Sequence, residues 1–208
     1  MLGIGVLLLI LTLGLAFLLA QANSRIARTP RLPVYGQVAD FTLTNQTGRA
    51  VSLADLRGRV WIADIIFTRC AGPCPIMTQE MKSLQDALPP DSPARLVTLT
   101  TDPDYDTAAV LRNYAERFGA DTNRWMFLTG TKKEIANLAV GSLKFSAVET
   151  KPEDRASPAD LFVHSTIFVL IDQRGQLRGI YQTSGEGVDW QKSKRDILAA
   201  AQQLERAG

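Results

Sequence analysis

The sequence predicts an α/β fold in which a mixed central sheet is flanked by helices. Three observations indicate it: buried strand-like runs alternate with helix-like runs, a tight hairpin comes late, and an amphipathic helix closes the chain. Strands that first alternate with helices and then form a hairpin indicate both parallel and antiparallel pairs. The expected strands are 60–67, 94–101, 125–128, 165–171 and 177–181, and the expected helices are 76–88, 107–118, 132–140 and 189–206.

Local patterns set the limits of these elements. The helix 76–88 carries Met77, Met81, Leu84 and Leu88 at spacings of four, three and four, which makes one apolar face. The stretch 172–175 reads as the turn between the last two strands, and 149–160 is charged and contains proline, as surface loops do.

A shorter hairpin is expected ahead of the first buried strand. Residues 40–43 and 50–52 alternate around the turn signal 45–48, and 53–58 reads as a turn into that strand. With this N-terminal hairpin added, the order of elements resembles the thioredoxin fold.

The chain of 208 residues divides into three parts. Residues 1–22 form a membrane anchor or a signal segment, because 2–20 carry no charge and Ala20-Gln21-Ala22 matches a cleavage pattern. Residues 23–36 form a polar tether with two prolines, and 37–208 form the folded domain. Arg25, Arg28 and Arg31 follow the apolar run, and the positive-inside rule taken alone would keep the domain in the cytoplasm.

Composition narrows the function classes. The chain is 46% hydrophobic and 21% charged with a net charge of +2 and no basic block, so nothing in it indicates nucleic-acid binding. Its two cysteines are too few for a disulfide scaffold, and the single histidine limits the ligands available to a soft metal.

Both cysteines, Cys70 and Cys74, lie where the strand 60–67 turns into the helix 76–88. Cys74 is expected at the N-cap, with Pro75 at the first helical position. The free N–H groups of that helix start stabilise an anion, so a thiolate there is expected to form more readily than in free cysteine. The three intervening residues, one more than in thioredoxin-like redox motifs, leave room for an ion; metal binding, redox chemistry and an inert pair all remain open.

His164 is the candidate third ligand. It immediately precedes the strand 165–171, and if that strand runs antiparallel to 60–67, its start lies beside the end where Cys70 follows. Two sulfurs and one imidazole suit Cu(I) better than a structural zinc ion, which takes four protein ligands. A lone histidine is more commonly a solvated or hydrogen-bonded residue.

Two further residues have weaker claims. Met77 could add a soft ligand, although its place on the apolar helix face favours core packing. Asp102 follows the strand 94–101 and could lie near the metal, whereas Asp106 or Thr107 would cap the next helix. The tryptophans, Trp61, Trp125 and Trp190, read as core or surface residues.

Four motifs taken together resemble the Sco/SenC family over residues 36–206. They are Phe67-Thr68-x-Cys70-x-x-x-Cys74-Pro75, Asp102-Pro103-x-x-Asp106-Thr107, His164-Ser165-Thr166 and Asp172-x-x-Gly175. The resemblance implies a membrane-anchored thioredoxin-fold protein that faces the periplasm. It implies copper bound by Cys70, Cys74 and His164, and delivery to the dinuclear copper centre of cytochrome c oxidase subunit II. A thiol reductant is then needed as a partner, because the compartment is oxidising.

The sequence departs from the family pattern at two places. Ala71-Gly72-Pro73 stands where Pro-Asp-Ile or Pro-Asp-Val is common, and Val163 rather than aspartate precedes His164. Both change the surroundings of the ligands without removing one. They leave open whether the chain serves the oxidase, another copper-accepting protein or thiol reduction. The alternative to a metallochaperone is a thiol–disulfide oxidoreductase, in which Cys70 attacks and Cys74 resolves. A peroxidase is disfavoured, because the Pro-x-x-x-Thr-x-x-Cys arrangement is absent.

Overall fold

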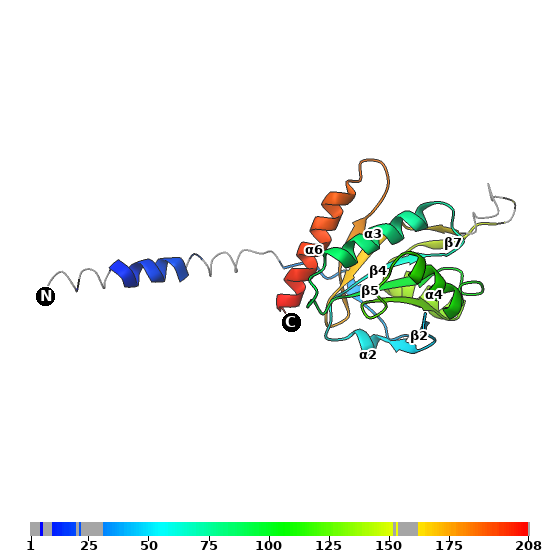
Figure 1. Ribbon diagram of the computed structural model, residues 1–208, viewed down its shortest axis with the longest axis horizontal. Coiled ribbons are helices and arrows are strands. Elements are labelled where there is room, and N and C mark those ends of the chain that lie inside the picture. Colours follow the sequence, from blue (N-terminus) through cyan, green and yellow to red (C-terminus); the bar gives the residue numbers. More distant parts are fainter. Residues whose placement is uncertain are drawn as a thin grey trace. The chain divides into compact units, whose positions relative to one another are not determined.

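The computed structural model describes residues 5, 10–19, 21, 31–151, 153 and 162–207, and for 147–149 and 162–164 it describes the backbone alone. Residues 33–208 form one compact unit, separate from 1–32 (Figure 1). No helix in the described ranges is both long enough and apolar enough to cross a bilayer. Of the predicted anchor or signal segment, 1–22, residues 5, 10–19 and 21 lie inside those ranges.

An eight-stranded mixed sheet forms the centre of this unit. Its order is β1-β10-β9-β4-β5-β6-β2-β3, with β4–β5 and β5–β6 parallel and the other pairs antiparallel. A separate antiparallel pair joins β7 to β8. The bounds are β1 Gly36–Gln37, β2 Thr42–Asn45, β3 Ala50–Ser52, β4 Trp61–Ile66, β5 Arg95–Thr100, β6 Trp125–Thr129, β7 Ala147–Glu149, β8 Phe162–His164, β9 Ile167–Ile171 and β10 Gln176–Gln182.

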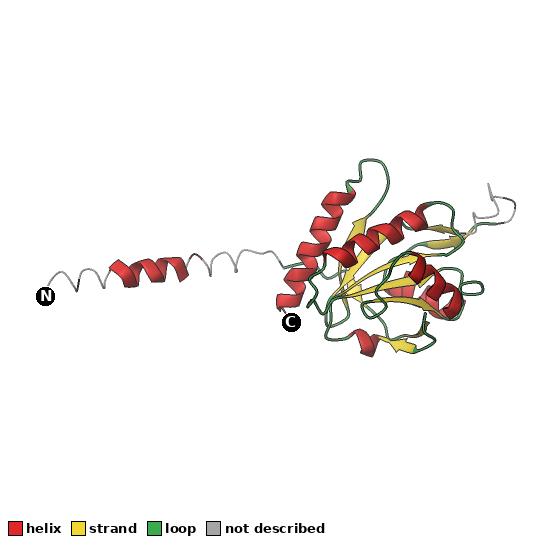
Figure 2. Ribbon diagram, in the orientation of Figure 1, coloured by secondary structure: helices red, strands yellow, loops and turns green. Residues whose placement is uncertain are grey.

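Helices cover both faces of the sheet. The crossovers β4–α3–β5 and β5–α4–β6 step in the same direction, and because such crossovers are right-handed, α3 and α4 lie on one face. Helix α6 packs beside α3 on that face (Figures 1 and 2). The bounds are α2 Leu53–Leu56, α3 Pro73–Ala87, α4 Ala108–Arg117, α5 Lys132–Ala136, the π-helix η1 Asn137–Ser142 and α6 Trp190–Ala207.

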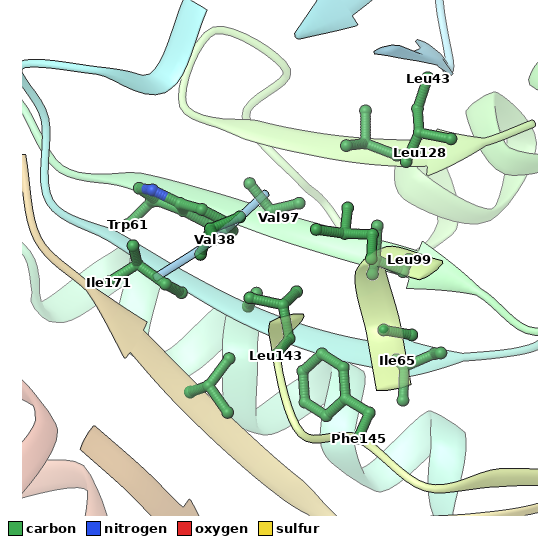
Figure 3. Close-up of a cluster of buried hydrophobic side chains, with 14 of the residues drawn as sticks. Val38, Leu43, Trp61, Ile65, Val97, Leu99, Leu128, Leu143, Phe145 and Ile171 are labelled. Atoms are coloured by element: carbon green, nitrogen blue, oxygen red, sulfur yellow. The ribbon is translucent and has the colours of Figure 1, made fainter. Parts of the chain in front are cut away.

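Strand β4 is buried on both sides, as its continuous apolar run predicts. Trp61, Ala63 and Ile65 point into the core beneath α2, α5 and η1, where Leu143 and Phe145 close over the sheet (Figure 3). The alternate residues of β4, among them Asp64, point to the face that α3 and α4 cover.

Three local expectations need correction. Residues 53–58 are not only a turn, because Ser52 and Asp55 form a capping box that starts the short helix α2. The single helix expected at 132–140 changes from α to π geometry at Asn137. Strands β7 and β8 were not expected, and most of the predicted loop 149–160 lies outside the described residues.

The turn of the β9–β10 hairpin is held by a buried carboxylate. Asp172 Oδ1 accepts hydrogen bonds from the N–H groups of Arg174 and Gln176, both at 2.9 Å, and its Oδ2 pairs with Arg178 at 2.7 Å. Gly175 has a φ of +76°, a left-handed conformation that glycine adopts without strain. These two residues of the fourth motif therefore have a structural role, at the end of β9 remote from the cysteines.

Replacing Asp172 by alanine should destabilise the fold by about 2–4 kcal/mol, because it removes three hydrogen bonds and leaves the largely buried Arg178 without its ion pair. Urea unfolding measures the loss. The control is Asp196→Ala, which breaks an exposed i,i+4 pair with Lys192 and should cost less than about 0.5 kcal/mol. Equal effects of the two substitutions would contradict the assigned role of Asp172.

Candidate metal and thiol site

Helix α3 begins two residues earlier than the sequence predicted. Gly72 is the N-cap, with φ −105° and ψ −117°, and Pro73 rather than Pro75 occupies the first helical position. Proline fits that position because its missing N–H would have no partner there. Cys74 therefore lies inside the first turn, and the Gly72 N–H donates to Cys70 Sγ at 3.4 Å.

The two thiols are reduced and differ in their exposure. Cys70 is half-buried, whereas Cys74 is fully buried. The pKa of the Cys74 thiol is raised, mainly by a hydrogen bond with Cys70 and secondly by burial. The expectation that the helix start favours a thiolate at Cys74 is therefore wrong for the metal-free protein, since the neighbouring thiol and burial outweigh the helix dipole. Cys70 is the sulfur that an approaching molecule meets first.

Three buried polar side chains near Cys74, those of Asp64, Thr78 and Tyr114, were not predicted from the sequence. Thr78 Oγ1 donates to the Cys74 carbonyl at 2.8 Å and lies 2.8 Å from Tyr114 Oη, which ties α3 to α4. The carboxyl of Asp64 is fully buried, and its charge contributes to raising the pKa of both Cys74 and Tyr114. A polar residue inside the apolar run 60–67 was the available signal.

Asp106 holds the start of the cysteine loop, residues 67–72, which joins β4 to α3. Its carboxylate accepts from the Thr68 N–H at 3.1 Å and from the hydroxyls of Thr68 and Thr100. Thr107, not Asp106, caps α4, by accepting from the Val110 N–H. Burial raises the pKa of Asp106, and the threonine hydrogen bonds oppose that rise. Asp106 thus fixes the backbone two residues before Cys70.

The other acidic residue of this motif reaches the same segment from the side. Asp102 is buried, and its Oδ2 pairs with an Arg69 guanidinium nitrogen at 2.5 Å. The Arg69 guanidinium also lies 4.0 Å from the centre of the Tyr105 ring. Asp102 therefore contacts the residue next to Cys70, rather than a cysteine.

Asp106→Ala should loosen the cysteine loop and cost about 2–4 kcal/mol, because it leaves the Thr68 N–H and two hydroxyls without their acceptor. Denaturant unfolding gives the cost, and the rate at which iodoacetamide alkylates buried Cys74 reports local opening. Asp104→Ala is the matched control, since Asp104 is exposed and, within the described part of the chain, forms an ion pair only with Lys132. If alkylation of Cys74 is no faster in Asp106→Ala than in the control, Asp106 does not hold this loop.

His164 is the last residue of β8, which pairs with β7, so the predicted strand 165–171 begins two residues late at Ile167. The predicted antiparallel pairing of β9 with β4 is confirmed, from Trp61 opposite Ile171 to Ala63 opposite Val169. The start of β9 therefore lies at the end of the sheet where β4 leads into the cysteine loop. The backbone of His164 is described, but its imidazole lies outside the described part of the chain.

Thr183 hydrogen-bonds a residue that follows His164 and also lies close to the cysteine helix α3. The N–H and the hydroxyl of Thr183 both donate to the Thr166 carbonyl at 3.0 Å. Thr183 also lies beside Glu80, which is on α3 six residues after Cys74. Glu80 is 9% exposed, and its Oε2 has no hydrogen-bond partner among the described residues. Burial raises the pKa of Glu80 to about 7, against a lowering by Thr183.

Glu80 should make stability fall as the pH rises. Between its ordinary pKa of 4.5 and about 7, the unfolded chain has lost the proton that the native protein keeps. Relative to the parent, Glu80→Gln should therefore gain up to about 3 kcal/mol between pH 4.5 and pH 8. Urea unfolding across this range measures the gain, with the exposed Glu116→Gln as control. A difference between Glu80→Gln and the parent that stays constant with pH would refute the assignment.

Met77 and the three tryptophans, which the sequence also singled out, have packing roles. Met77 is 1% exposed on the inner face of α3, which agrees with core packing. Trp61 and Trp125 are fully buried, and Trp190 packs edge-on against Phe168 at 5.6 Å. In the described side chains, which exclude His164, no three Cys, His, Asp or Glu residues gather as a metal-binding group.

Comparison with known proteins agrees with this fold. A sequence profile of the SCO1/SenC family matches residues 33–198. The chain belongs to the SCO1/SenC family. The SCO1 protein homolog of Bacillus subtilis is 36% identical over 169 residues, which cover 80% of this Sco protein and 83% of the relative.

Two solved structures are similar to this Sco protein. BsSco, a member of the Sco family of cytochrome c oxidase assembly proteins in which a disulfide switch was identified, is 32% identical with a TM-score of 0.67; the match covers 83% of this chain and 98% of BsSco. Yeast Sco1 with copper bound is 24% identical with a TM-score of 0.64, and the match covers 83% and 90%. The predicted thioredoxin-like fold and the family are therefore confirmed.

Proposed function

We propose that this Sco protein is a copper carrier in which Cys70, Cys74 and His164 bind Cu(I). One observation supports this most strongly: two thiols within hydrogen-bonding contact lie at the end of the sheet where the chain enters β9, three residues after His164. Thiolates are soft ligands that select Cu(I), and three ligands satisfy it. The copper bound by yeast Sco1 supports the same cargo.

The acceptor that we propose is the dinuclear copper site of cytochrome c oxidase subunit II. The support is membership of the family together with the assembly role named for BsSco. Because Cys70 is half-buried, one side of the site is open to solvent. The acceptor's own ligands would displace the three ligands of this protein one at a time from that side, so the copper ion is never free in solution. Asp102 would act from a distance by holding Arg69 beside Cys70.

We further propose that residues 1–22 attach the protein to the inner membrane, with the folded domain in the periplasm. Attachment restricts the search for a membrane-bound acceptor to two dimensions and raises its effective concentration. The arginines that follow the apolar run argue against this orientation, and the family resemblance argues for it. In an oxidising compartment the cysteine pair needs a thiol reductant before it can take up Cu(I).

Anaerobic titration of the reduced full chain in detergent with Cu(I), against a competing chelator, tests the ligand set. One equivalent should bind tightly, and Cys70→Ala, Cys74→Ala or His164→Ala should each weaken binding by at least about 100-fold, because each removes a metal–ligand bond. Met77→Leu is the matched control and should bind as the parent does.

The same titration judges a second candidate, a thiol–disulfide oxidoreductase. It is favoured by the unequal exposure of the thiols, because accessible Cys70 could attack and buried Cys74 could resolve the mixed disulfide. The disulfide switch of BsSco supports it too. Copper binding that does not depend on His164 would refute the three-ligand site and favour this candidate.

A further inference from the structure

A cleft of about 300 Å³ lies between the cysteine loop and α4. Its main lining residues are Thr68, Arg69, Tyr105, Asn113, Tyr114 and Arg117. Thr68 and Arg69 directly precede Cys70, so the cleft adjoins the segment of chain that carries the more exposed thiol of the pair. Neither the fold nor the proposed binding of Cu(I) requires a cleft at this position.

Two guanidinium groups in the cleft rest on aromatic rings. Arg69 lies 4.0 Å from the centre of the Tyr105 ring, and Arg117 lies 4.9 Å from Tyr114 and 5.1 Å from Phe118. A guanidinium stacked by its face keeps its N–H donors free at the edge, in a fork that matches a carboxylate. The rings also hold these long side chains in place, which lowers the entropy lost when an anion binds.

The charge in the cleft is only partly neutralised. Asp102 pairs with Arg69, but Arg117 has no ion pair among the described residues. Arg117 therefore keeps its positive charge beside the Asn113 amide, whereas the Thr68 hydroxyl already donates to Asp106. A volume near the lower limit of small-molecule sites fits a ligand of several heavy atoms.

We propose that this cleft binds the carboxylate of a small anionic thiol and thereby directs its sulfur to Cys70. In the oxidised protein, the thiolate attacks Sγ of Cys70, the Cys70–Cys74 bond breaks, and Cys74 leaves as a thiolate that takes a proton from water. A second thiol attacks the mixed disulfide, which releases Cys70 and a small-molecule disulfide. Two electrons pass from two thiols to the cysteine pair, and no metal takes part.

The test measures how fast three small thiols of different charge reduce the oxidised, metal-free full chain in detergent. They are anionic 3-mercaptopropionate, neutral 2-mercaptoethanol and cationic cysteamine. For each thiol, the ratio of the variant's rate to the parent's cancels the intrinsic reactivity of the thiol. Arg117→Glu should slow 3-mercaptopropionate about tenfold and leave 2-mercaptoethanol unchanged, because the substitution reverses the local charge.

The controls separate binding from a change in structure. Arg117→Gln should give an intermediate effect, and rising salt should reduce the parent's preference for the anionic thiol. Lys133→Glu makes the same charge change on α5, outside the cleft, and should not alter the ratios. Equal slowing of all three thiols by Arg117→Glu, or no slowing, would overturn the proposal. Since copper is absent, the result is independent of the copper titration.

Discussion

The antiparallel pairing of β4 with β9 is the constraint on which the site depends. Its register, from Trp61 opposite Ile171 to Ala63 opposite Val169, runs through the fully buried centre of the sheet. A shift of one residue would turn every buried side chain of a strand to the wrong face, so the core fixes the register firmly. As a result, the end of β4 and the start of β9, about a hundred residues apart in sequence, meet at one end of the sheet.

Polar contacts then fix what the sheet brings together. Asp106 holds the backbone ahead of Cys70, and Thr183, which lies beside Glu80 of the cysteine helix, hydrogen-bonds the Thr166 carbonyl after His164. These groups are buried, so each contact is made in a low dielectric and a missing partner would be costly. These contacts hold the cysteine loop on its buried side, so the loop can expose the sulfur of Cys70 without moving freely.

The sequence was sufficient for the sheet and for the placement of the cysteine loop, because long apolar runs and helical periodicity leave few arrangements of the core. Prediction from the sequence failed where two local conformations, such as helix starts at adjacent positions, have similar energies. Pro73 and Pro75 both suit a helix start, and only the turn at Gly72 selects Pro73. The predicted effect on Cys74 also failed, because the contact with Cys70 and the depth of burial depend on tertiary packing. For the same reason the roles of Asp64 and Glu80 could not be predicted.

The motif residues separate by what their side chains contact. Asp172 and Asp106 accept several hydrogen bonds from the adjoining backbone and hydroxyls, so their carboxylates are fully used in shaping a hairpin and a loop. Cys70 and Arg69, by contrast, are partly open to solvent, and Arg69 lines the cleft. A sequence motif contains both kinds of residue, because substituting either kind would impair the protein. Burial and hydrogen-bond partners distinguish them, which is why we propose that the chemistry of this Sco protein takes place at the cysteine loop and its rim rather than at every residue of the motifs.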